Sequence, residues 1–355
     1  MKLKALYLVC KKQDMKRVTV FVISLICIIC DVKGQIMFKP EVHGTIRSKY
    51  EYKTEDEEGR FEVRNARISI TGNVIDEVSY KAEVDLCNEG KIKMLDAYTR
   101  IKPIKRMSFT IGQMRVPFTI DAHRSPHLQY FANRSFIAKQ VGNVRDVGAS
   151  LGYNFDCGFP IVAEVGLFNG SGLTNQADYW TKSINYSGKI QFIFPKGYNL
   201  TLSTQKIKPG YFSIYMYDIG AYYHSDRWHI EAEYLLKKYS HNSFDNVSAI
   251  DAFVNYDIPV RNSLIKKVSP LVRYDYMTDQ SDGKGYLDGV ENKESGVLIE
   301  NDYRRHRVTT GVTLSLSKPF ITDIRLNYEN YFYRSGASPK VSERDKIVIE
   351  FMTRF

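Results

Sequence analysis

The chain ends in KIVIEFMTRF, residues 346–355, and this stretch alternates between two kinds of side chain. One set of alternate positions is mostly apolar: Ile347, Ile349, Phe351, Thr353 and Phe355. The other set contains the charged residues Lys346, Glu350 and Arg354. A period of two predicts a β-strand that has one face in an apolar medium and the other in a polar medium.

The same alternation recurs along the chain and predicts sixteen strands. In residues 95–101, for example, the apolar face is predicted to carry Leu95, Ala97, Thr99 and Ile101. The predicted strands cover residues 41–53, 61–73, 77–87, 92–102, 106–113, 145–155, 160–169, 183–194, 198–206, 212–224, 227–238, 247–257, 268–277, 303–316, 321–333 and 345–355.

The composition favours a membrane barrel over a soluble β-sandwich, which would also alternate. The chain has 25 Tyr and 19 Phe among 355 residues, yet only 43% of its residues are hydrophobic. Charged residues occupy the second face of nearly every predicted strand, which suits a wet lumen. Aromatic residues also gather toward strand ends, as at Tyr50 and Tyr52 or Tyr153 and Phe155, where barrels carry interface girdles. We therefore expect an all-β, transmembrane antiparallel β-barrel of about 16 strands.

The first 34 residues resemble a secretory signal peptide, and residues 35–355 are expected to form a single barrel domain. A basic start at Met15 is followed by the apolar run 18–30, which is shorter than the roughly 20 residues that a transmembrane helix needs. Met15 is therefore the predicted true start. A lipoprotein anchor at Cys27 or Cys30 is an alternative, but each follows Ile instead of a small residue.

The connections between the predicted strands alternate between short turns and long loops, as in bacterial outer-membrane barrels. The sequence thus predicts export to the outer membrane, with contacts to lipid and lipopolysaccharide. A C-terminal aromatic residue on an alternating strand is also the signal that the barrel assembly machinery reads. Phe355 is the predicted assembly signal.

One connection, residues 114–144, is unusually long, aromatic and basic. It has a single acid, Asp121, and four cations: Arg115, Arg124, Arg134 and Lys139. A sixteen-stranded barrel encloses a wide aqueous channel, and a third outer loop that folds inward would narrow it. Arginine and lysine at a narrow point favour the passage of anions such as phosphate.

Strand alternation also predicts cations that face the lumen from the wall: Lys81, Arg100, Arg273, Arg305, Arg307 and Arg325. Acidic neighbours share the same faces, including Glu83, Asp96 and Asp275. Many of these cations are therefore expected to form cross-strand ion pairs.

Four segments resemble the phosphate-selective porin O/P family in its Bacteroidetes form: GRFEVRNARISITG (59–72), YKAEVDLCNEGKIKMLDAY (80–98), GQMRVPF (112–118) and FANRSFIAKQVGNVRDVG (131–148). The resemblance implies a sixteen-stranded barrel, a homotrimer and an anion pathway lined by basic residues. Carried over by position, the pathway residues are Arg115, Arg124, Arg134, Lys139 and Arg145. The sequence and the resemblance together predict a passive, anion-preferring outer-membrane porin.

Other functions find less support in the sequence. A sugar- or peptide-specific channel and a general diffusion channel stay open as alternatives, since Phe and Tyr of the long loop suit an aromatic track. No nucleophile motif indicates a barrel enzyme. His123 and His127 have a zinc-ligand spacing, but Pro126 interrupts any helix there. We expect no metal, no cofactor and no nucleic-acid partner.

Overall fold

The computed structural model describes residues 38–87, 92–142, 144–173, 176–210, 212–261, 264–283, 286–287, 290–291, 302–316, 321–337 and 339–355. Residues 40–355 form one compact unit, which contains every described strand. The predicted signal peptide, with Met15, lies outside the described residues. In the described part of the chain, no helix is both long enough and apolar enough to cross a bilayer.

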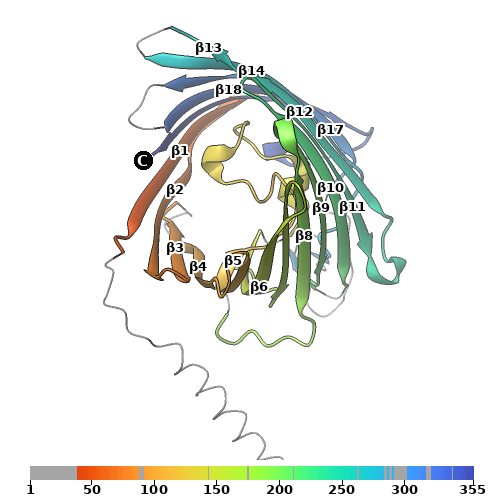
Figure 1. Cartoon of the computed structure of the whole chain (residues 1–355). Helices are drawn as coiled ribbons and strands as arrows, with labels where there is room; N and C mark the ends of the chain where they lie inside the picture. Colours follow the sequence, from red (N-terminus) through yellow and green to blue (C-terminus); the bar gives the residue numbers. More distant parts are fainter. Residues whose placement is uncertain are drawn as a thin grey trace, which may run out of the picture. The chain divides into compact units, whose positions relative to one another are not determined.

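Sixteen long antiparallel strands close into a barrel, as predicted (Figure 1). Each strand pairs with its neighbours in sequence, and the last strand, β19, pairs with β1. The long strands are β1 (Glu41–Lys53), β2 (Glu58–Ile75), β3 (Val78–Asp85), β4 (Lys93–Ile101), β5 (Met107–Arg115), β6 (Arg145–Asp156), β7 (Pro160–Phe168), β8 (Asn185–Ile193), β9 (Tyr198–Ile207), β10 (Ile214–His224), β11 (Trp228–Tyr239), β12 (Val247–Tyr256), β14 (Ile265–Met277), β17 (Arg305–Leu316), β18 (Ile321–Tyr333) and β19 (Lys346–Arg354).

The remaining strands have only two residues each. β13 (Ile258–Pro259) follows β12 and pairs with β14, while β15 (Tyr286–Leu287) and β16 (Val290–Glu291) pair with each other. The first hairpin is longer than the sequence predicts, because β2 begins at Glu58 and not at residue 61. We call the end of the barrel that holds the connection between β2 and β3 the short-turn end, and the opposite end the long-loop end.

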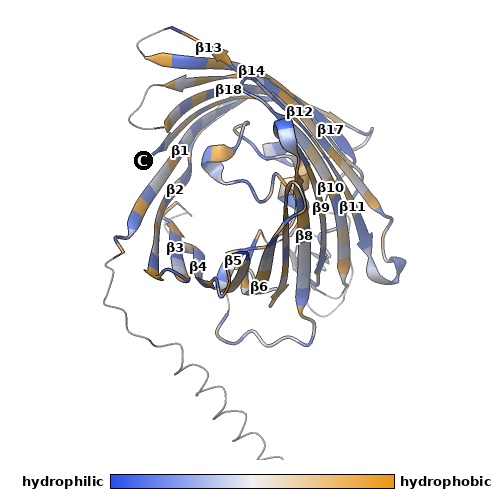
Figure 2. Ribbon diagram, in the orientation of Figure 1, coloured by the Kyte–Doolittle hydropathy of each residue, from blue (hydrophilic) through white to orange (hydrophobic). Residues whose placement is uncertain are grey.

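The alternation along the strands separates two faces of the wall. Hydrophobic and hydrophilic residues follow one another along each strand in Figure 2. Outward side chains are apolar and exposed, among them Ile46, Phe61, Val63, Ile68 and Ile70. Inward side chains are polar or charged and buried, among them Arg307, Arg325, Glu329 and Glu350. An exposed apolar belt around a polar interior is the pattern that a lipid bilayer requires.

Leu95 corrects one detail of the predicted alternation. A register shift in the pairing of β3 with β4 sets Val84 opposite Met94 and Glu83 opposite Asp96. This bulge adds one residue to β4 and turns Leu95 away from the outer face, where Met94 is exposed instead. A bulge leaves no period of its own in the sequence, so alternation by itself could not have placed it.

The C-terminal residue packs at the seam that closes the barrel. The backbone N–H of Gly44 donates to the carbonyl of Phe355 at 2.8 Å, and that of Phe355 donates to Gly44 at 3.1 Å. The Phe355 ring lies directly over Gly44, because a Cβ added there would sit 2.2 Å from its Cζ atom. Glycine at residue 44 therefore makes room for the terminal aromatic ring.

We predict that Gly44→Val slows barrel closure, because the new side chain and the Phe355 ring compete for one space. Overpacking of this kind costs about 1–3 kcal/mol. The measurement is the folded fraction during refolding into detergent, followed by the mobility of unheated samples in electrophoresis. Gly188→Ala is the control, since a Cβ there meets its nearest atom at 3.6 Å. Equal refolding of Gly44→Val and wild type would contradict the role of the seam.

Candidate functional site

Residues 116–144, which we call the inner loop, connect β5 to β6 and lie inside the ring of strands (Figure 1). The inner loop contains only one turn of 3₁₀ helix, η1 (Pro126–Leu128), and a short helix, α2 (Phe136–Gln140). Most of its backbone groups therefore have no partner within regular secondary structure. Buried backbone groups need partners, so the wall must supply them.

The first part of the inner loop is held by strands β8 to β11. Ile120 donates its N–H to a carboxylate oxygen of Glu233 at 2.5 Å, and Thr119 donates its N–H to Ser203 at 3.1 Å. In the other direction, Lys189 donates its ammonium to the Thr119 carbonyl at 3.0 Å. These hydrogen bonds fix the first part of the inner loop, where Thr119 adopts a left-handed backbone conformation with φ of 56°.

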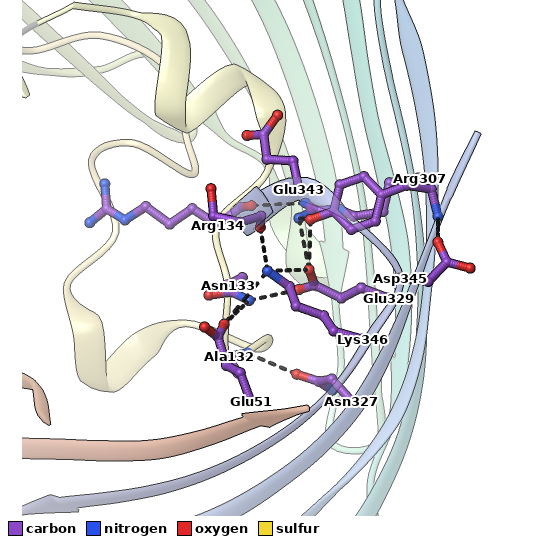
Figure 3. A network of polar contacts seen from close by, with 12 residues as sticks. Glu51, Ala132, Asn133, Arg134, Arg307, Asn327, Glu329, Glu343, Asp345 and Lys346 are labelled. Carbon is purple, nitrogen blue, oxygen red and sulfur yellow. Dashed lines mark hydrogen bonds and ion pairs between the residues drawn. The ribbon is translucent and has the colours of Figure 1, made fainter. Parts of the chain in front are cut away.

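The middle of the inner loop is held by the opposite side of the wall (Figure 3). Ala132 donates its N–H to Asn327 at 2.9 Å, and the Asn133 amide donates to Glu329 at 3.0 Å. Cations of the wall bind the carbonyl groups of the same segment: Arg47 binds Ala132 at 2.8 Å, Arg273 binds Asn133 at 3.1 Å and Arg307 binds Arg134 at 2.8 Å. Hydrogen bonds to charged groups contribute about 1.5–3 kcal/mol each.

Helix α2 is the apolar anchor of the inner loop. Ser135 caps it by accepting the N–H of Ala138 at 3.1 Å, and Asp275 accepts the N–H of Phe136 at 3.1 Å. Phe136 and Ile137 are fully buried in the main hydrophobic cluster, and the guanidinium of Arg305 lies 4.4 Å from the Phe136 ring centre. The helix is thereby packed against the wall and leaves the other side of the lumen free.

The six wall cations predicted to face the lumen all contact polar groups there. Arg307 bonds with Asp275 at 2.7 Å, Arg325 with Glu350 at 2.6 Å and Lys81 with Asp96 at 2.6 Å. Arg273 bonds with Asp275 at 2.9 Å and Arg305 with Glu343 at 3.3 Å. Arg100 donates to Thr110 at 3.0 Å. Five of the six are therefore balanced by carboxylates.

Two cavities lie between the inner loop and the wall formed mainly by β1 to β4, with Arg145 of β6 and Arg354 of β19. The outer cavity, toward the long-loop end, measures about 320 Å³. Its charged lining residues are Arg47, Arg64, Arg67, Lys93, Arg134, Arg145 and Asp85. The inner cavity, toward the short-turn end, measures about 310 Å³. Arg67 and Pro126 line both cavities, so the two adjoin each other beside the loop, and we call them together the passage.

The outer cavity is strongly basic, with six cations and one carboxylate among its described lining residues. Arg47 and Arg145 are backed by carboxylates, Glu350 at 2.5 Å and Asp96 at 2.5 Å. Arg134 differs, because its guanidinium bonds only to the carbonyl groups of Ala122 and Arg124, both at 3.4 Å. In Figure 3 its side chain points away from the polar network that holds its own backbone.

The structure separates the five cations that the sequence grouped together. Arg134 and Arg145 line the outer cavity, and Arg115 donates to the carbonyl of His123 at 2.8 Å. Arg124 bonds with Glu231 at 2.5 Å, and Lys139 lies 3.4 Å from Glu343. Arg124 and Lys139 are not among the residues that line either cavity, because the anchoring carboxylates hold them elsewhere.

Four lining cations come from strands and were not among the sequence candidates: Arg47, Arg64, Arg67 and Lys93. The alternation of β1 and β2 already placed Arg47 and Arg67 on the inward face, so this signal was present in the sequence. Their position beside the passage depends on which part of the wall the inner loop leaves uncovered. Sequence alternation gives the face of a residue but not its neighbour across the lumen.

The far end of α2 is tied to the outer loops by one carboxylate. Asp302 accepts hydrogen bonds from Gln140 at 2.9 Å, Gln280 at 2.8 Å and Lys340 at 2.8 Å. Burial raises the pKa of Asp302, but the hydrogen bond from Lys340 and the charge of Arg305 outweigh it and hold that pKa below its usual value. The carboxylate is therefore charged under ordinary conditions and keeps α2 connected to two outer loops.

Other candidate chemistry of the sequence has no site in the described residues. His123 and His127 lie on a turn and on η1, and no group of three or more potential metal ligands occurs among the described residues. Cys87 and Cys157 are both free.

The wide barrel, the inner loop and the basic passage agree with one protein family. Residues 41–206 match the model of phosphate-selective porin O and P. This match confirms the resemblance that the sequence motifs indicate. It covers β1 to β9 with the inner loop, and both cavities except for Arg354. A search of curated protein sequences gives no match to this chain.

Solved outer-membrane proteins share the fold at low sequence identity. An anion-selective porin from Comamonas acidovorans has a TM-score of 0.60 at 11% identity, covering 89% of this chain and 99% of that one. The outer membrane channel DcaP of Acinetobacter baumannii gives 0.59 at 14%, covering 91% and 98%. OmpT of Vibrio cholerae, in its trimer form, gives 0.59 at 11%, covering 90% and 99%. The chain thus shares the closed β-barrel fold of these outer-membrane proteins.

We predict that Asp275→Ala loosens the inner loop. Asp275 accepts the backbone N–H of Phe136 and forms ion pairs with Arg273 and Arg307. Its removal leaves these two buried guanidinium groups without that carboxylate. Breaking such buried pairs costs about 3–5 kcal/mol. Trypsin should then cleave the native protein in detergent after Arg134 or Lys139 at least about tenfold faster.

The control for this experiment is Asp323→Ala. Asp323 is also an inward carboxylate, but among the described residues it bonds with Ser315 and Arg325 of the wall and with none of the inner loop. Equal cleavage rates in both variants would contradict the anchoring role of Asp275.

Proposed function

We propose that the protein is a passive, anion-preferring channel, and that small anions such as phosphate pass through the two cavities beside the inner loop. The observation that carries the proposal is the charge of the outer cavity, six cations against one carboxylate. A low-dielectric wall focuses the field of such a cluster, so it acts on a passing ion more strongly than the charge of the whole chain does.

The arrangement of charges also allows a bound anion to leave the passage. Arg47, Arg67 and Arg145 are each within 3.0 Å of a carboxylate, which weakens their hold on a passing anion. Arg134 lacks a carboxylate within salt-bridge distance in the described residues, so its planar guanidinium remains available for a phosphate or carboxylate group. Several weak sites in series allow an ion both to enter and to leave.

The alternative of an aromatic track for sugars finds less support. Phe118, Phe131 and Phe136 of the inner loop are almost fully buried against the wall. Tyr130 is half-buried and stacks on His229 at 4.6 Å between ring centres. These rings act as anchors, so they present no continuous aromatic surface to the passage.

The homotrimer implied by the family resemblance belongs to the same proposal. OmpT of Vibrio cholerae is described as a trimer form, and it shares the barrel fold. The exposed apolar outer face of this barrel offers surface for a second copy as well as for lipid. Cross-linking of the detergent-purified protein should therefore give a trimer.

The direct test is the reversal potential of the purified protein in a planar bilayer under a KCl gradient. We expect the potential to lie toward the chloride equilibrium value. A potential toward the potassium value would overturn the proposal.

We predict that Arg134→Gln lowers the chloride-to-potassium permeability ratio severalfold, because this guanidinium lines the outer cavity and has no carboxylate within salt-bridge distance among the described residues. Arg344→Gln is the matched control, since it removes the same charge from an outer loop where Arg344 is paired with Asp56 at 3.0 Å. At 0.1 M salt, screening over about 10 Å should leave the control close to wild type. An equal loss in both variants would show that total charge, and not the passage, sets selectivity.

A further inference from the structure

The inner cavity carries hydroxyl groups that passage of a simple ion does not require. Thr45 of β1, Ser69 and Thr71 of β2 and Ser125 of the inner loop all line it. None of these four hydroxyl groups makes a hydrogen bond with another described residue. Elsewhere in the lumen the hydroxyls of Ser150, Ser187 and Ser203 bond to the wall or to the inner loop. The hydroxyls of the inner cavity are therefore available to a solute.

The same cavity also holds cations and imidazoles. Arg67 and Lys81 line it, and both pair with Glu83, the one carboxylate among the described lining residues. Arg354 also lines it and has no carboxylate within salt-bridge distance in the described residues. His43 and His127 face the cavity from β1 and from the inner loop. A solute there meets positive charge and neutral hydrogen-bonding groups side by side, whereas the outer cavity offers mainly positive charge.

The volume of the cavities and their shared lining limit the size and the shape of a solute. Sites that hold small organic ligands measure roughly 300–1,000 Å³, and each cavity reaches the lower end of this range. Arg67 lines both cavities, so an anionic group held near it leaves the rest of the solute beside Ser69 and Thr71. A solute that uses both features has one anionic group and a hydroxylated body.

We propose that the passage favours hydroxylated organic anions, namely sugar phosphates and sugar acids, over inorganic phosphate. This inference rests on the proposed function and names the substrate class of the same passage. The cations hold the phosphate or carboxylate group. The hydroxyls of Thr45, Ser69 and Thr71 can each donate and accept, so they pair with the hydroxyl groups of the sugar as it crosses.

The test is the block of KCl current through the wild-type channel by glucose 6-phosphate, inorganic phosphate and glucose at the same pH. We expect glucose 6-phosphate to halve the current at a concentration at least fivefold lower than inorganic phosphate does. Glucose should block little, because it lacks the anionic group. Block by inorganic phosphate at equal or lower concentration than glucose 6-phosphate would overturn the inference.

The double variant Ser69→Ala/Thr71→Val isolates the hydroxyl groups. It should weaken the block by glucose 6-phosphate severalfold and leave the block by inorganic phosphate unchanged. Thr313→Val is the matched control, because Thr313 is an inward hydroxyl of β17 that makes no hydrogen bond with a described residue and is not among the lining residues of either cavity. An equal change for both solutes, or an equal effect of the control, would overturn the inference.

Failure of this inference and failure of the proposed function give different results. If the reversal potential shows chloride preference but glucose 6-phosphate has no advantage, only the substrate class is wrong. If the channel shows no anion preference, the proposed function fails and the inference fails with it.

Discussion

An irregular backbone inside the barrel needs hydrogen-bond partners, and side chains of the wall provide many of them; the rest of the structure depends on this constraint. The inner loop has just one short helix and one 3₁₀ turn, so most of its N–H and C=O groups turn to side chains. Glu233 and Asp275 accept its N–H groups, while Arg273 and Arg307 donate to its carbonyls. The buried charges of the wall are thereby explained as partners of the loop as much as of one another.

The same constraint divides the lumen. Side chains of β8, β9, β11, β14, β17 and β18 hydrogen-bond with the inner loop, and α2 adds an apolar contact through Phe136. Arg67 of β2, which lines both cavities, pairs instead with Glu83 and Asp85 of the wall, and Arg134 of the loop lines the outer cavity beside it. A basic passage thus remains on the side that the loop does not cover. In the proposed channel, the place where the loop is anchored therefore decides which cations an anion would meet.

Arginine residues both anchor the inner loop and line the outer cavity. The partner of each guanidinium decides which of these two roles it has. Arg307 lies between Asp275, Glu329 and the Arg134 carbonyl, so its charge is balanced and its position fixed. Arg134 turns its backbone to that anchor and its guanidinium to the outer cavity (Figure 3). One residue therefore joins the rigid part of the loop to the surface that an anion would meet. A fixed guanidinium loses little conformational freedom when it binds a planar or tetrahedral anion.

The sequence by itself determined the barrel, because a period of two is a local property that each strand carries on its own. Alternation predicted sixteen strands, the inward face of Arg273, Arg307 and Arg325, and the aromatic residue Phe355 on the last strand. The tertiary structure decided the bulge at Leu95, the seam over Gly44 and the separation of Arg134 from Arg124 and Lys139. These depend on pairs far apart in the chain, such as Arg47 with Glu350 and Arg124 with Glu231. No periodicity records which carboxylate lies across the lumen, so only the closed barrel shows which cations are neutralised.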